Sequence, residues 1–151
     1  MQIRAYNVKP HTIQNPLAIM KGKRPLDAYI KWLTTFQVLA ALDAAKRSQG
    51  TNQNCNTLTE NLMIACGIWS KIQNKKQYDI AALAWEALSK AADRPTDLLD
   101  LTTGEYKTIQ KAIVAYIRQL SVVEVGVYAY ATINAQTSLH GREHNEKGRN
   151  H

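Results

Sequence analysis

Apolar residues recur at alternating steps of three and four from Thr102 to about Gln136. This spacing places them on one face of a helix, so it predicts a single long helix over 102–136. A stripe of about 30 residues spans roughly 45 Å and needs neighbouring helices to bury it. It consists of Tyr106, Ile109, Ile113, Tyr116, Leu120, Val123, Val127 and Tyr130.

Three shorter segments, 25–48, 57–72 and 78–92, show the same helical periodicity. Pro25 suits the first position of a helix, where a missing N–H costs nothing. The pattern predicts an all-α protein whose residues 25–136 form a four-helix bundle-like domain. In the first helix the inward stripe is expected to be Leu26, Tyr29, Ile30, Leu33, Phe36, Ala40 and Ala44.

Two motifs predict helix starts. Thr57 with Glu60, and Thr102 with Glu105, match a capping box, in which the Thr side chain caps the helix and the Glu side chain reaches back. Gly126 lies inside the long predicted helix, where it costs ~1 kcal/mol relative to Ala. It marks either a close crossing or a bend.

The three tryptophans, Trp32, Trp69 and Trp85, lie on three different predicted helices. We expect them to pack in the core, and an exposed one would be an interface anchor.

The flanking segments lack a helical period. Residues 1–24 contain two prolines and scattered apolar side chains, which predicts an extended arm laid over the bundle. Residues 137–151 are polar, which predicts a disordered tail.

The net charge of the 151-residue chain is +7, and residues 1–24 contribute +5 of it. Such an arm suits the phosphates of nucleic acid, with Tyr6 and His11 able to stack on bases, although it could equally be a solubilising segment. A second basic cluster follows Trp69, and helix-end electrostatics is its alternative explanation. The candidate nucleic-acid-binding residues are Arg4, Tyr6, Lys9, His11, Lys21, Lys23, Arg24, Lys71, Lys75 and Lys76.

The cysteines Cys55 and Cys66 lack metal-ligand spacing, so we interpret them as free thiols of a reducing cytoplasm. No apolar run approaches the ~18 residues of a membrane span, and the segment Met1-Gln2-Ile3-Arg4 lacks the apolar region of a signal peptide. We therefore expect a cytoplasmic protein without a membrane partner.

One pattern resembles a catalytic motif. The segment from His140 to His144 matches the H-x-x-E-H zinc signature. It contains a glycine, has no apolar face and lacks a third ligand, so we expect neither a metal nor any other cofactor. No other group of residues assembles an active site, and we expect a non-enzyme.

The distal part of the long predicted helix is a candidate protein interface. The helix is longer than the other three, so its end is expected to extend beyond them and to form a homodimer or partner surface. The interface residues are Val127, Tyr128 and Tyr130.

The segment Tyr6-Asn7-Val8-Lys9-Pro10, followed by Asn15-Pro16-Leu17, resembles the start of small uncharacterised proteins of proteobacterial phages, prophages and related elements. The resemblance covers about the first 45 residues and implies a mobile-element accessory protein.

The basic arm, the helical fold and this resemblance together leave three hypotheses for the function. The first is binding of nucleic acid or a nucleoprotein through the arm. The second is inhibition of a host defence protein such as a CRISPR effector, and the third is a structural phage component.

Overall fold

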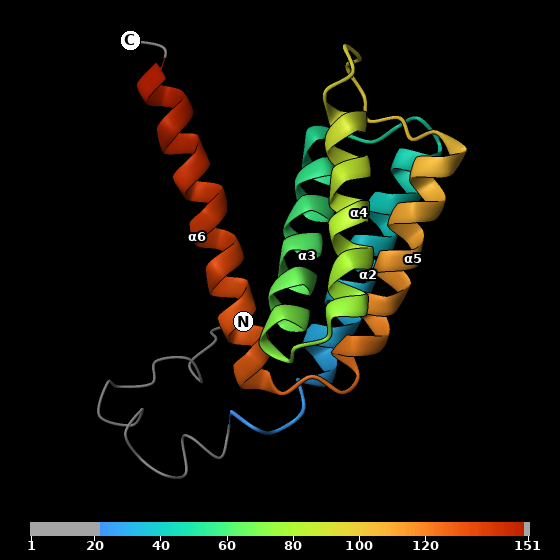
Figure 1. Cartoon of the computed structure of the whole chain (residues 1–151). Coiled ribbons are helices and arrows are strands. Elements are labelled where there is room, and N and C mark those ends of the chain that lie inside the picture. The colour runs from blue at the N-terminus through green and yellow to red at the C-terminus, as the bar shows by residue number, and fades with distance from the viewer. Residues whose placement is uncertain (1–21, 150–151) are drawn as a thin grey trace.

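The computed structural model describes residues 22–149, with side chains placed up to Leu139. The described residues form five α-helices and no strand (Figure 1). The all-helical prediction is confirmed, but the predicted count of four helices is wrong for this part of the chain. The helices are α2 (Ala28–Lys46), α3 (Asn52–Lys71), α4 (Lys75–Ala92), α5 (Thr103–Leu120) and α6 (Val125–Arg149).

Four of the helices, α2 to α5, lie side by side (Figure 1). Each of α2 and α4 packs against both α3 and α5. Helix α6 packs against α3 and diverges from the other helices toward its C-terminal end. Among the described helices, none combines the length and the apolar content that a membrane span requires.

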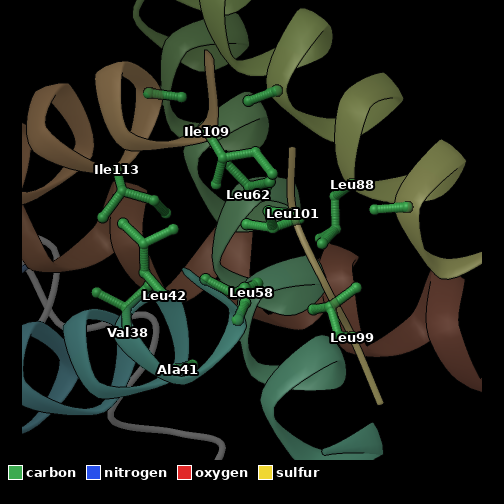
Figure 2. Close-up of a cluster of buried hydrophobic side chains, with 14 residues drawn as sticks. Val38, Ala41, Leu42, Leu58, Leu62, Leu88, Leu99, Leu101, Ile109 and Ile113 are labelled. Carbon is green, nitrogen blue, oxygen red and sulfur yellow. The ribbon is translucent and has the colours of Figure 1, made fainter. Parts of the chain in front are cut away.

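Two apolar clusters fill the space between the helices. The first draws on α2 to α5 and on the loop that precedes α5, with Leu58, Leu62 and Ile109 at its centre (Figure 2). The second contains Trp69 and Tyr116 and extends to the residues of α6 that face α3. Every member of both clusters removes apolar surface from water, which is the main force that holds the helices together.

The predicted helix over 102–136 is interrupted, which corrects the prediction. Helix α5 ends at Leu120, a turn follows, and α6 begins at Val125. The break is fixed by residues distant in sequence, because the Val125 N–H donates to the Arg24 carbonyl (2.9 Å) and the Gly126 N–H donates to the Gly22 carbonyl (2.7 Å). The long periodicity therefore covers two helices that share one apolar core.

Gly126 is required by this approach of two chain segments. A Cβ added at Gly126 would lie 2.9 Å from the Gly22 carbonyl oxygen, closer than real Cβ atoms come to other atoms. The two expectations for this glycine were a close crossing and a bend, and the structure shows both, because the close approach to Gly22 lies beside the break between α5 and α6.

The N-cap of helix α3 is Thr51, six residues before the predicted cap Thr57. Thr51 caps the helix by accepting from the Asn54 N–H, and the Asn54 side chain accepts from the Thr51 N–H. The Thr57 hydroxyl instead donates to the Gln53 carbonyl inside the helix. The box that contains Glu105 is confirmed at the start of α5.

The inward face of α2 also differs from the prediction. The buried residues are Val38, Ala41, Leu42 and Ala45, whereas Tyr29 and Phe36 are exposed. The pattern was ambiguous because apolar residues occur on both faces of this helix. Among the tryptophans, Trp69 is buried and Trp85 is half-buried against the first cluster, so these two pack as expected, but Trp32 is exposed.

Residues 137–149 continue α6 as a helix, so the tail predicted from Thr137 onward is wrong for this range. Ala131 and Ala135 are buried against the rest of the chain, and Leu139 is half-buried. The segment that matches the zinc signature starts at His140, beyond the last residue whose side chain the structure describes, so the side chains of His140 and His144 lie outside the described residues.

Candidate nucleic-acid interface

The outward face of α5 carries a row of cations. Lys107, Lys111 and Arg118 follow one another at steps of four and seven, with the exposed Val114 between them. Residues at these steps lie on one face of a helix. The opposite face of α5 is buried in the core, so the fold directs this row into solvent.

Helix α4 adds a fourth cation from its first turn. Lys76 is the second residue of α4, next to Lys75. A positive charge at a helix N-terminus is unfavourable, because the backbone N–H groups there are themselves partly positive. The Lys75 ammonium is compensated by the Asp79 carboxylate at 2.8 Å, whereas Lys76 forms no ion pair with any described residue. The helix-end electrostatics that the sequence suggested for the basic cluster is therefore wrong for Lys75 and Lys76, although it holds for Lys71, which is the last residue of α3.

A groove of about 410 Å³ lies between α4 and α5. Its lining contains four cations and no carboxylate, so its electrostatic potential is positive. No aromatic side chain lines it either. The lining residues are Lys76, Gln77, Ile80, Lys107, Gln110, Lys111, Val114, Ala115 and Arg118, which we call the basic groove.

The groove gathers most of the cations that lack a partner within the described part of the chain. Side chains are described for thirteen Lys and Arg residues. Six of them contact a carboxylate or an aromatic ring, which leaves seven, and four of these seven line the groove. Unpaired cations in a common groove are the arrangement that attracts a polyanion.

The groove also contains an unused hydrogen-bond acceptor. The Gln77 Oε1 atom is buried and accepts no hydrogen bond from any described residue. An unpaired buried acceptor is costly, by about 1–3 kcal/mol. A ligand hydroxyl or amine, or a water molecule, would satisfy it.

The structure divides the predicted basic cluster between different contacts. Lys71 lies over the Tyr130 ring, with Nζ 4.8 Å from the ring centroid, and Lys75 is paired with Asp79. Lys76 alone lines the basic groove.

Two of the predicted arm residues lie within the described part of the chain. Lys23 and Arg24 are exposed, a few residues before α2. The start of α2, the start of α4 and the end of α5 lie at the same end of the molecule (Figure 1). The other predicted arm residues, Arg4, Tyr6, Lys9, His11 and Lys21, lie outside the described residues.

The predicted protein interface on α6 lies largely against the chain itself. Val127 and Tyr128 are half-buried and pack against the second cluster. Tyr130 is exposed and contacts Lys71. Because α5 ends at Leu120 and α6 begins at Val125, these three residues lie near the start of α6 and not at the far end of one long helix, as the prediction assumed.

Sequence reasoning missed Lys107, Lys111 and Arg118. A signal was present, because all three recur on the face of the predicted helix opposite its apolar stripe. The signal is weak because these cations are separated by other residues and form no run of charge along the chain.

The described residues show no group of three His, Cys, Asp or Glu side chains that could hold a metal ion. Cys55 and Cys66 are both free thiols, as predicted. Burial raises the pKa of both thiols, and that of Cys66 reaches about 11. Both are therefore protonated near neutral pH and poorly nucleophilic.

Comparisons of the chain with protein-family models, curated proteins and solved structures gave no match.

Proposed function

We propose that this chain is a non-catalytic nucleic-acid-binding protein that holds the sugar–phosphate backbone in the basic groove of α4 and α5. The observation that carries the proposal is the convergence of Lys76, Lys107, Lys111 and Arg118 in one groove without any carboxylate. The arm predicted from the sequence would add further phosphate contacts beside it.

The lining favours binding that does not depend on base sequence. Lys and Arg contact phosphates through charge, which carries no sequence information. Stacking on bases needs aromatic side chains, and the groove has none. Gln77 and Gln110 are its uncharged polar side chains, and they suit hydrogen bonds to sugars or base edges.

The number of cations sets the expected salt dependence. Four phosphate contacts give a slope of log K against log salt of about −3.6 on duplex DNA and about −2.8 on a single strand. Cations of the arm would make the slope steeper. Loss of one contact reduces the slope by about one.

The test is fluorescence anisotropy with labelled single-stranded and duplex DNA and RNA at several salt concentrations. We expect Lys107→Gln/Lys111→Gln to weaken binding by at least about tenfold and to reduce the slope by about two. The matched control is Arg47→Gln/Lys90→Gln, which removes the same charge from two exposed ion-paired side chains outside the groove. This control should change the affinity much less.

A further variant separates the groove from the arm. Arg4→Gln/Lys9→Gln in the full-length chain should weaken binding only if the arm contributes. If Lys107→Gln/Lys111→Gln and Arg47→Gln/Lys90→Gln reduce the affinity equally, binding depends only on the net charge, and the groove is not the site. If the unmodified protein binds no nucleic acid at low salt, the proposal fails, and inhibition of a host protein becomes the hypothesis to test by pull-down.

A further inference from the structure

The outward face of α2 carries four large apolar side chains. Tyr29, Trp32, Phe36 and Leu39 are 55%, 62%, 60% and 44% exposed. The Trp32 and Phe36 rings stack with their centroids 5.8 Å apart, and the Tyr29 and Trp32 centroids are 6.5 Å apart. We call these four residues the aromatic row.

The opposite face of α2 is buried in the first cluster. Helix α2 is therefore apolar on both of its faces. A helix of this kind is normally covered on both sides, because its outer face would otherwise leave a large apolar surface in water. Within the described part of the chain, one of these sides is left open to solvent.

The face is poor in charge, which excludes a polyanion as its occupant. Between Tyr29 and Leu42 the single charged residue is Lys31, which is half-buried. At the end of the row, the Asp43 carboxylate is neutralised by Arg47 at 3.1 Å. The surface thus suits an apolar and uncharged partner face.

The spacing of the row is the same in both directions. The steps between its members are three, four and three residues. When two copies of α2 lie antiparallel, this spacing sets Tyr29 opposite Leu39 of the second copy and Trp32 opposite Phe36. A two-fold axis passes near Thr34, and every large exposed side chain of the row meets another.

We propose that the aromatic row is a self-association surface, on which α2 of a second copy packs antiparallel to form a two-fold symmetric dimer. Such isologous pairs are the commonest form of homo-oligomer. The exposed part of the four side chains amounts to roughly 500 Å² per chain, or about 1,000 Å² for the pair. This area is near the lower limit for a specific interface, so we expect dissociation in the micromolar range.

The salt dependence of dimer formation is expected to differ from that of nucleic-acid binding in the basic groove. Two chains of net charge +7 repel each other at low ionic strength, and the row contributes no ion pair of its own. Added salt should therefore strengthen the dimer, whereas it should weaken nucleic-acid binding. The dimer is independent of the proposed function, because none of its residues lines the groove.

The test is sedimentation velocity of the full-length protein over a range of concentrations. We expect a monomer–dimer equilibrium that Trp32→Glu and Phe36→Glu each weaken by at least about 30-fold. Both side chains are exposed, so circular dichroism should show that the folded helices persist. The matched control is Ile133→Glu on α6, because Ile133 is 62% exposed, the same fraction as Trp32.

Disulfide trapping tests the orientation, in a background where Cys55 and Cys66 are replaced by alanine. In the antiparallel register, Tyr29→Cys mixed with Leu39→Cys should give a cross-linked heterodimer. Tyr29→Cys alone should not cross-link, because its two copies lie about 15 Å apart along the axis at ~1.5 Å per residue.

Three results would overturn the proposal. The first is a protein that stays monomeric at all concentrations, which would leave the row for the predicted N-terminal arm of the same chain or for a different protein. The second is a dimer that Ile133→Glu dissociates and Trp32→Glu does not, which would place the interface on α6. The third is efficient cross-linking of Tyr29→Cys to itself, which would show a parallel pair.

Discussion

Glu105 connects the start of α5 to the loop before it. Its replacement by glutamine measures how much this connection contributes to the free energy of unfolding. The Arg94 guanidinium donates to both carboxylate oxygens, at 2.8 and 2.7 Å, and the Thr102 N–H donates to Oε1 at 2.9 Å. Arg94 also donates to the Asp100 carbonyl. The carboxylate therefore joins a helix cap to an ion pair that reaches eleven residues back along the chain.

The magnitude follows from the ionisation of Glu105. The Arg94 guanidinium, together with hydrogen bonds from Thr102, lowers the pKa of Glu105 from 4.5 to about 2. At about 1.4 kcal/mol per pKa unit, the full shift would correspond to about 3 kcal/mol of folding free energy. The Arg94 side chain is 37% exposed, so solvent screens the pair, and we expect about 1–2 kcal/mol.

The sign of the pH dependence is fixed by the direction of the shift. A carboxyl whose pKa is lower in the folded state stabilises the fold above the unfolded pKa of 4.5. This stability is lost as the pH falls toward about 2. Glu105→Gln cannot lose a proton, so its unfolding free energy should lack this part of the pH dependence.

The assay is urea unfolding of the wild type and Glu105→Gln, followed by circular dichroism at pH 7 and pH 3. We expect Glu105→Gln to be less stable by about 1–2 kcal/mol at pH 7, and by less than half of that at pH 3. The control is Glu86→Gln, because Glu86 pairs with Lys90 at 3.4 Å on an exposed surface and should contribute little. A difference that stays constant with pH, or that Glu86→Gln reproduces, would refute the assigned role of Glu105.

Two further substitutions test the packing and the helix ends. Tyr116→Phe leaves the Asn61 Oδ1 atom without its 3.0 Å hydrogen bond in the core, and urea unfolding should show a loss of about 1–3 kcal/mol. A loss below about 0.5 kcal/mol would show that water replaces the hydroxyl. Gln73 has a φ of 59°, which glycine adopts without strain. Gln73→Gly should therefore raise the unfolding free energy by about 0.5–1 kcal/mol, and a decrease would contradict this explanation.

Local sequence rules predicted the parts of the fold that depend on neighbouring residues. The periodic stripe identified Ile109, Ile113, Tyr116 and Leu120, all of which are buried in α5. The capping box that contains Glu105 was also correct, because its partners lie within four residues. Both signals act within a turn or two of helix, where spacing alone decides which side chains meet.

The break between α5 and α6 could not be predicted in the same way. Val123 is buried and keeps the apolar period intact across the turn. No proline or glycine interrupts the residues between Leu120 and Val125. The bend is stabilised by backbone hydrogen bonds to Gly22 and Arg24, about a hundred positions earlier, and such pairing leaves no periodic signal.

The basic groove was predictable only in part, for a related reason. Its cations come from two helices, and their convergence depends on how α4 packs on α5. Lys76 was a candidate because it lies in a cluster of lysines, but nothing in the sequence pairs that residue with Arg118. The aromatic row was missed because large apolar residues are normally assigned to the core.

Three of the four cations in the groove, Lys76, Lys107 and Lys111, are placed where they work against helix stability, which bears on the interpretation of the groove. Lys107 and Lys111 are like charges four residues apart on one helical face, and such pairs destabilise a helix by a few tenths of a kcal/mol. Lys76 adds a cation at a helix N-terminus. The other charged side chains on the same two helices have partners. Lys75 pairs with Asp79, Lys90 pairs with Glu86, and Glu105 pairs with Arg94. Local rules are most often violated at functional sites, and here the violations coincide in one groove. A solvated surface selected only for stability would have placed a carboxylate among these cations, as the rest of α4 does.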